Sequence, residues 1–143
     1  MNRFFLLLII GGMMLLSSCT KHELTLGDQQ NQIATKLKKS PWKPGAVLRD
    51  GVDITGDYTN FSLSFSNGTY TTVNGDLSWP VNGTWAFESG SLTKIIRDGN
   101  IPVDLKLSAD GKNLTLQFSI SSSVYTGGRS TSLQGGYEFQ LVQ

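Results

Sequence analysis

Hydrophobic and polar residues alternate along much of the chain beyond residue 60. Phe61, Leu63 and Phe65 alternate with serines, and after turn residues at 66–68 a second short run continues to Val73. A period of two places every second side chain on one face of a β-strand, and the Asn-Gly pair within 66–68 is a turn dipeptide. This stretch therefore predicts a β-hairpin.

The same alternation recurs later in the chain, between turns that contain glycine. Further strands are predicted over 83–87, 92–96, 101–107, 114–120 and 137–141, with an opening hairpin that folds at Asp50-Gly51 between Val47 and Ile54. Short turns join antiparallel neighbours, because a parallel crossover needs about a dozen residues or more. The pattern predicts an all-β fold of eight or so short strands, an antiparallel meander that closes into an up-and-down barrel. A β-sandwich is the alternative, since alternation alone does not separate the two.

One face of each strand should fill the interior of this barrel. Eight-stranded barrels have room inside for side chains or for one small ligand. The inward set is bulky, which favours a filled barrel over an open pocket. Its members are Phe61, Leu63, Phe65, Trp85, Phe87, Leu105, Leu116, Phe118 and Phe139.

The first eighteen residues have a different pattern. Arg3 precedes an apolar run from Phe4 to Leu16, and the small residues Ser17 and Ser18 follow it. A helix that crosses a bilayer needs about 20 apolar residues, so this run is too short to span. Its charged, apolar and small-residue regions are those of a secretory signal peptide, predicted over residues 1–18.

Residues 16–19, with the sequence Leu-Ser-Ser-Cys, resemble the lipobox of bacterial lipoprotein signals. This resemblance implies that Cys19 is linked to diacylglycerol, that the signal is cut before it and that the new amino terminus is acylated. Two or three acyl chains give lasting membrane attachment. Thr20 follows Cys19, at the position where an Asp retains many lipoproteins at the inner membrane. We therefore expect the protein to be anchored in the bacterial outer membrane, on either its periplasmic or its surface face.

Residues 19–41 are predicted to be a tether that joins the lipid to a β-domain over residues 42–143. Within the tether, Ile33 and Leu37 lie four apart and lysines follow, which predicts a short helix capped by Asp28. A disordered linker is the alternative, because isolated helices of about 12 residues are marginal in water. Ser40-Pro41 would end the helix.

The segment DGVDITGDYTNFSLSFSNGTYTTVNG, followed by WPVNGTWAF, resembles the lipocalin-like lipoproteins of Bacteroidetes. In those proteins an aspartate-rich opening, an F-x-L-x-F strand, a GTYTT strand and a GTW strand follow one another. The G-x-W motif of true lipocalins is absent, because Ser40 and Pro41 precede Trp42. The resemblance covers most of residues 42–143 and implies a barrel. It does not imply that this protein binds a lipocalin's ligand, because proteins that share a fold can differ in function.

The charge balance and the few candidate nucleophiles argue against several classes of function. Twelve Lys and Arg nearly balance eleven Asp and Glu, so nucleic acid is not an expected partner. The one histidine, His22, lies in the tether, Cys19 is the only cysteine and no G-x-S-x-G motif occurs. Asp50, Asp53 and Asp57 lack the spacing of a calcium loop. We therefore expect no enzyme, no cofactor and no metal site.

Aromatic residues are the remaining candidates for binding. Ligand pockets favour apolar walls with a few polar groups. The loop over residues 121–136 is long and rich in Ser and Gly, so it is either a binding loop or an unordered surface excursion. The candidate ligand-binding residues are Trp42, Tyr58, Tyr70, Trp79, Tyr125 and Arg129.

Two functions follow from these observations. The first is a lipid-anchored, non-catalytic barrel that binds a small apolar or glycan-like ligand. The second is a structural or protein-interaction lipoprotein with a filled barrel that meets a protein partner in the envelope. A cavity of a few hundred Å3 inside the barrel would favour the first, and a solid interior the second.

Overall fold

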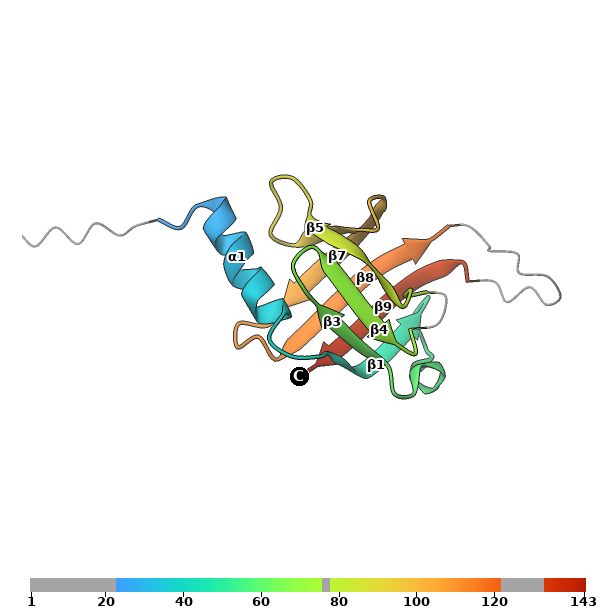
Figure 1. The fold of residues 1–143 in the computed structure, drawn as a ribbon. Coiled ribbons are helices and arrows are strands. Elements are labelled where there is room, and N and C mark those ends of the chain that lie inside the picture. Colours follow the sequence, from blue (N-terminus) through green and yellow to red (C-terminus); the bar gives the residue numbers. More distant parts are fainter. Residues whose placement is uncertain (1–22, 76–77, 122–132) are drawn as a thin grey trace, which may run out of the picture.

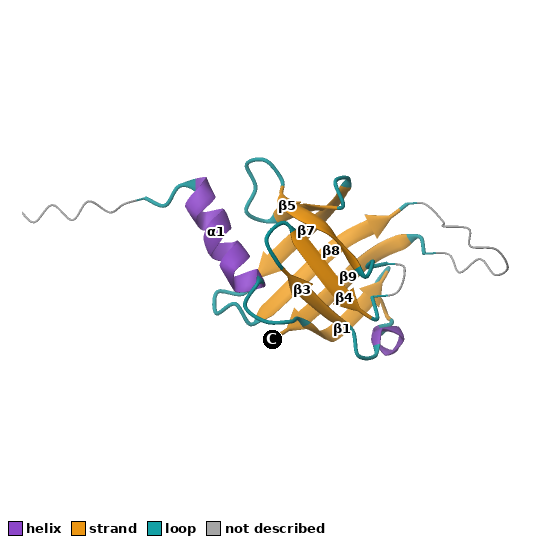
Figure 2. Ribbon diagram, viewed as in Figure 1, coloured by secondary structure: helices purple, strands orange, loops and turns teal. Residues whose placement is uncertain are grey.

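The computed structural model describes residues 23–75, 78–121 and 133–143, so the predicted signal peptide and Cys19 lie outside the described residues. One α-helix precedes the strands, and a single turn of 3-10 helix, η1, follows the second strand (Figures 1 and 2). The elements are α1 (Leu26–Leu37), β1 (Lys43–Arg49), β2 (Val52–Asp53), η1 (Thr55–Tyr58), β3 (Ser62–Phe65), β4 (Thr69–Val73), β5 (Asn82–Phe87), β6 (Lys94–Arg97), β7 (Ile101–Leu107), β8 (Asn113–Ile120) and β9 (Gly135–Val142).

The strands form one curled antiparallel sheet. Its order is β2-β1-β9-β8-β7-β6-β5-β4-β3, so that β3 to β9 follow one another and the first long strand pairs with the last. The curl brings β3 back beside the start of β1, where Trp42 and Leu63 exchange backbone hydrogen bonds of 2.8 and 2.9 Å. This confirms the prediction of an all-β up-and-down barrel, with only a short seam between its two edges.

Asp-Gly pairs form two of the turns that join neighbouring antiparallel strands. Asp50 and Gly51 have φ of 49° and 79°, and Asp98 and Gly99 have φ of 52° and 79°. Two consecutive positive φ angles define the type I′ turn, whose twist matches that of the flanking strands. The predicted hairpin at Asp50-Gly51 is confirmed, since Arg49 pairs with Val52 across it.

The interior of the barrel is occupied by the side chains that alternation predicts. Phe139 and Leu116 are fully buried, while Thr115 and Gln140 on the other face of their strands lie at the surface or partly exposed. Of the predicted inward set, every member is buried except Phe87, which is partly buried and packs against the core. Phe87 is the last residue of β5, and its ring packs against that of Trp85 with the centroids 5.7 Å apart.

Helix α1 lies across one end of the barrel, beside the turns at 88–93 and 108–112 (Figure 1). Leu37 is fully buried and Ile33 packs against the core, as the predicted stripe requires. The indole Nε1 of Trp42 donates a 2.9 Å hydrogen bond to the Leu37 carbonyl and so satisfies the end of the helix. The predicted helix is therefore confirmed. We call this end of the barrel the α1 end, and the end with the turns at 50–51 and 98–100 the far end.

The start of the helix differs from the prediction. Thr25 is the N-cap, and Asp28 occupies the third helical position. The Thr25 hydroxyl accepts from the Asp28 N–H at 3.2 Å, and the Asp28 carboxylate accepts from the Thr25 N–H at 3.0 Å. This reciprocal capping box satisfies two backbone donors where a cap at Asp28 would satisfy fewer. The helix thus begins at Leu26, two residues before the predicted cap.

Candidate functional site

The structure buries the four described aromatic residues that we predicted for a ligand pocket. Trp42, Tyr58, Tyr70 and Trp79 belong to the hydrophobic core, and none is more than 3% exposed. They lie within the core: the rings of Tyr58, Tyr70 and Trp79 pack against other rings, and Trp42 is covered at the α1 end, where its indole donates to Leu37. Tyr125 and Arg129, the other two candidates, lie outside the described residues.

Phe139 lies at the centre of this aromatic packing. Its ring centroid is 5.0 Å from that of Tyr58, 5.3 Å from Phe61 and 5.8 Å from Trp79. Aromatic rings at these separations attract one another beyond the area that they bury. The middle of the barrel is therefore filled by protein side chains.

Arg97 is a buried cation that the sequence analysis missed. Its side chain is 2% exposed, and the guanidinium carbon lies 4.4 Å from the Trp79 ring centroid and 4.6 Å from that of Phe118. Its Nη1 donates a 3.0 Å hydrogen bond to the Ser78 carbonyl. Alternation in β6 could have located it, because Ile95 points inward and Arg97 is two residues further on.

Burial has a cost for this guanidinium. Loss of solvent lowers the pKa of Arg97 below its usual value. Its Nε lies 3.5 Å from Oδ2 of Asp98 but makes no hydrogen bond, and the indole Nε1 of Trp79 also has no hydrogen-bond acceptor. The Asp98 carboxylate, two aromatic faces and one carbonyl together offset the desolvation of the charge.

Asp98 joins this arginine to Tyr70. The Tyr70 hydroxyl donates to Oδ2 of Asp98 at 2.7 Å, and the Thr84 N–H donates to Oδ1 at 3.0 Å. Burial, and then the hydrogen bond to the carboxylate, raise the pKa of the Tyr70 phenol above its ordinary value. A Cβ on Gly83 would collide with the Asp98 carboxylate and the Tyr70 hydroxyl, so glycine is required there for the close approach.

The groups of this cluster are paired with one another. Tyr58 and Ser78 share a 2.5 Å hydrogen bond between their hydroxyls, which adds the β4–β5 connection to the network. The cluster therefore links η1, β4, the β4–β5 connection and β6 inside the barrel, and the Asp98 side chain is 29% exposed.

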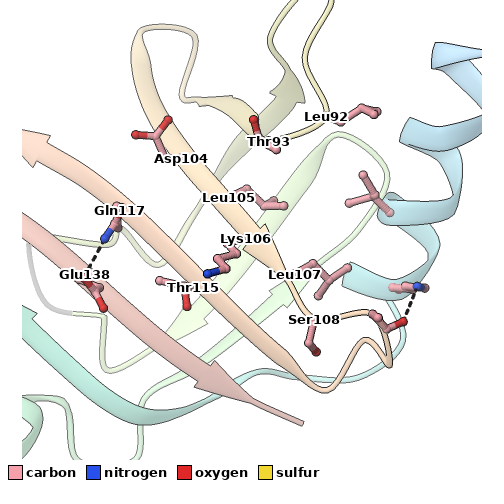
Figure 3. Close-up of a pocket in the computed structure, with 13 residues that line it drawn as sticks. Leu92, Thr93, Asp104, Leu105, Lys106, Leu107, Ser108, Thr115, Gln117 and Glu138 are labelled. Carbon is pink, nitrogen blue, oxygen red and sulfur yellow. Dashed lines mark hydrogen bonds between the residues drawn. The ribbon is translucent and has the colours of Figure 1, made fainter.

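A groove of about 790 Å3 lies on the outside of the barrel, between α1 and the outer faces of β7, β8 and β9 (Figure 3). We call it the helix–sheet groove. Ile33, Leu92 and Leu107 supply apolar wall near the helix. Asp104, Lys106, Thr115, Gln117 and Glu138 supply a polar floor from the strands.

Hydrogen bonds order the polar floor of this groove. Gln117 Nε2 donates to Oε2 of Glu138 at 2.7 Å, and Gln140 Nε2 donates to Oε1 at 2.6 Å. These two bonds, that from Gln140 first, lower the pKa of Glu138 below its usual value. Lys94 also lies 3.5 Å from Asp104 in an exposed ion pair. The groove thus presents fixed charges of both signs beside apolar wall, an arrangement suited to binding a polar molecule.

Two of the three aspartates considered as calcium ligands, Asp50 and Asp53, have structural partners. Asp53 accepts from the Thr55 N–H at 2.8 Å, and Asp50 accepts from the Gly136 N–H at 2.8 Å. Among residues 23–75, 78–121 and 133–143, no group of three or more His, Cys, Asp and Glu side chains is placed to hold a metal ion. No helix within these ranges is long and apolar enough to cross a membrane.

Fold and site together define a curled up-and-down β-barrel with a filled interior, a helix across one end and a groove on its outer face. Neither a protein-family model nor a curated protein matches this sequence.

Proposed function

We propose that this protein is a lipid-anchored lipoprotein of the bacterial outer membrane, related to the lipocalin-like lipoproteins of Bacteroidetes, that acts through the outside of a filled, non-catalytic barrel. The observation that carries this proposal is the packed interior. Phe139, Trp79 and Arg97 occupy the space that a lipocalin uses for its ligand. The partner is then a protein of the envelope that contacts the outer surface.

The lipobox supports the anchor. Leu16, Ser17, Ser18 and Cys19 match it at every position, and the apolar run before it is too short to span a bilayer. Because Cys19 carries the lipid in this proposal, the only thiol of the chain takes no part in catalysis. The buried pairing of Arg97, Asp98 and Tyr70 supports a non-catalytic role, since these groups hold each other.

Replacement of the acylated residue tests this function. Cells that express the wild-type protein or Cys19→Ala are grown with an alkyne-tagged fatty acid, and the protein is then examined for the tag and for its distribution between membrane and soluble fractions. We expect the wild type to carry the tag in the outer-membrane fraction, and Cys19→Ala to carry none and to leave that fraction. Ser18→Ala is the matched control, because it keeps a small residue before Cys19 and should be tagged.

An untagged wild type would overturn the anchor. If the tagged protein is cross-linked within intact envelopes and never joins another protein, the protein-interaction role fails while the anchor stands.

The helix–sheet groove favours a second function, the binding of a small glycan-like ligand. Its volume of about 790 Å3 lies within the roughly 300–1,000 Å3 of typical ligand sites. Amide and carboxylate groups of Gln117 and Glu138 are oriented by their mutual hydrogen bond, as sugar hydroxyls require. Saturation-transfer NMR with envelope oligosaccharides should show binding that Gln117→Ala weakens. Equal signals for Gln117→Ala and the wild type would exclude this groove.

A further inference from the structure

The α1 end of the barrel is a continuous surface held together by side chains of the helix. Gln30 Nε2 donates to the Ser91 carbonyl at 2.8 Å, Lys36 Nζ to the Ala109 carbonyl at 3.0 Å, and Lys38 Nζ to Oδ1 of Asn67 at 2.6 Å. These contacts join α1 to three different turns. The helix therefore belongs to the folded barrel, and the chain that leads to Cys19 departs from this end.

The distance from Cys19 to this surface is limited by the chain. The N-cap Thr25 is the sixth residue after Cys19, so six residue-to-residue steps join the two. Fully extended, six residues reach at most about 21 Å, and the 12 residues of α1 span about 18 Å. If Cys19 is held at the membrane, the first turn of α1 has to stay within about 21 Å of it, whereas the tether sets no such limit for the far end.

Two large apolar side chains are exposed at this point. Leu24 is 47% exposed and Leu26 is 41% exposed, on either side of the helix cap. Neither belongs to the core cluster or packs against it. Leucines in the first turn of a helix next to a lipid anchor are suited to the boundary between headgroups and acyl chains.

The two ends of the barrel also differ in charge. Five basic and four acidic residues lie at the α1 end, against two basic and four acidic residues at the far end, so an anionic lipid surface repels the α1 end less, although Glu23 and Asp28 lie beside the two leucines. The residues at the α1 end are Lys36, Lys38, Lys39, Lys43 and Lys112 with Glu23, Asp28, Glu88 and Asp110; those at the far end are Asp50, Asp53, Asp57 and Asp98 with Arg49 and Arg97.

We propose that the α1 end of the barrel docks on the lipid surface, with Leu24 and Leu26 inserted among the headgroups, and that the far end faces away from the membrane. This orientation rests on the proposed lipid anchor at Cys19. It assigns the far end, with the turns at 50–51 and 98–100, to any partner that approaches from the aqueous side.

Quenching by brominated lipid tests the orientation in the full lipidated protein. The protein is reconstituted into vesicles of phosphatidylethanolamine and phosphatidylglycerol, with or without bromine on the acyl chains. Leu24→Trp adds a fluorophore at the α1 end, and Val52→Trp, at a residue 64% exposed, adds one at the far end. The three native tryptophans are buried and give a constant background. We expect brominated lipid to quench the added emission of Leu24→Trp at least several-fold more than that of Val52→Trp.

A second pair of variants tests the insertion itself. In the Leu24→Trp protein, Leu26→Glu should reduce the quenching by half or more, because a carboxylate opposes insertion next to anionic lipid. Val73→Glu changes a residue 56% exposed at the far end and should leave the quenching unchanged.

The outcomes separate the anchor from the orientation. Protein that does not float with the vesicles overturns the lipid anchor and with it the docking. Protein that floats while Leu24→Trp and Val52→Trp are quenched equally overturns the docking alone, as does an equal effect of Leu26→Glu and Val73→Glu.

Discussion

At the scale of single residues, polar groups inside the barrel are stabilised by one another and by aromatic rings. Arg97 lies between Trp79 and Phe118, and its neighbour Asp98 receives the Tyr70 hydroxyl. A buried hydrogen-bond partner that is removed leaves the other group unsatisfied, which costs more than the bond contributes. The Tyr70–Asp98 pair therefore affects stability in a way that depends on pH.

We expect Tyr70→Phe to lower the free energy of unfolding by about 1–3 kcal/mol near neutral pH, because Asp98 loses a donor. The variant should also change how the free energy of unfolding depends on pH in the alkaline range. Since the pKa of Tyr70 is raised in the folded protein, an unfolded chain loses this phenolic proton near pH 10, before the folded one does. Stability is thus fully present below about pH 10 and falls as the pH rises further.

Urea unfolding between about pH 8 and about pH 11 measures both effects. The wild type should lose stability toward the alkaline limit more steeply than Tyr70→Phe, so the two curves converge. Parallel curves would show that the Tyr70 proton is not held by the fold.

Sequence reasoning located the turn of this cluster but not its cation. Asp98-Gly99 is recognisable because aspartate followed by glycine favours a type I′ turn. Arg97 precedes that turn and lies just beyond the strand predicted over 92–96, although β6 extends to Arg97 and places its side chain inward with Ile95. A charged residue at an inward position conflicts with the hydrophobic pattern, and only the neighbouring Trp79 and Phe118 rings, far apart in sequence, explain it.

At the scale of elements, α1 depends on tertiary packing. Twelve residues are too few for a stable isolated helix, but Leu37 is fully buried beside the barrel core. The strands were predictable because alternation survives wherever one face is buried. The exact start of α1 was harder to predict, because Thr25 and Asp28 are both good capping residues. Only the reciprocal hydrogen bonds between them decide which one is the N-cap.

Leu37→Ala tests whether α1 is part of the folded unit. We expect the free energy of unfolding to fall by about 2–5 kcal/mol, the cost of removing a buried leucine from a core. Gln32→Ala, on the exposed face of the same helix, is the matched control and should change stability by less than about 0.5 kcal/mol. Chemical denaturation followed by circular dichroism measures both, and equal stability of the two variants would mean that the helix is a detached linker.

At the scale of the whole molecule, the two ends of the barrel differ in what covers them. Helix α1 covers one end, and the described part of the far end is bounded by turns, among them those at 50–51 and 98–100. The sequence could not predict the helix–sheet groove, because the groove exists only where α1 lies beside β7. The filled interior was predictable from the bulk of the inward-facing residues.

Phe139→Ala tests whether the interior is filled, which the proposed function requires. Removal of this ring from the middle of the aromatic packing should cost about 3–5 kcal/mol of unfolding free energy and leave an apolar cavity. Such a cavity should admit benzene, so saturating benzene should raise the melting temperature of Phe139→Ala and leave that of the wild type unchanged. Phe87→Ala removes the same ring at the partly exposed rim, and should show a smaller loss and no response to benzene. Stabilisation of the wild type by benzene would reveal a void that already exists in the barrel. That result would favour ligand binding inside the barrel over a function of its outer surface.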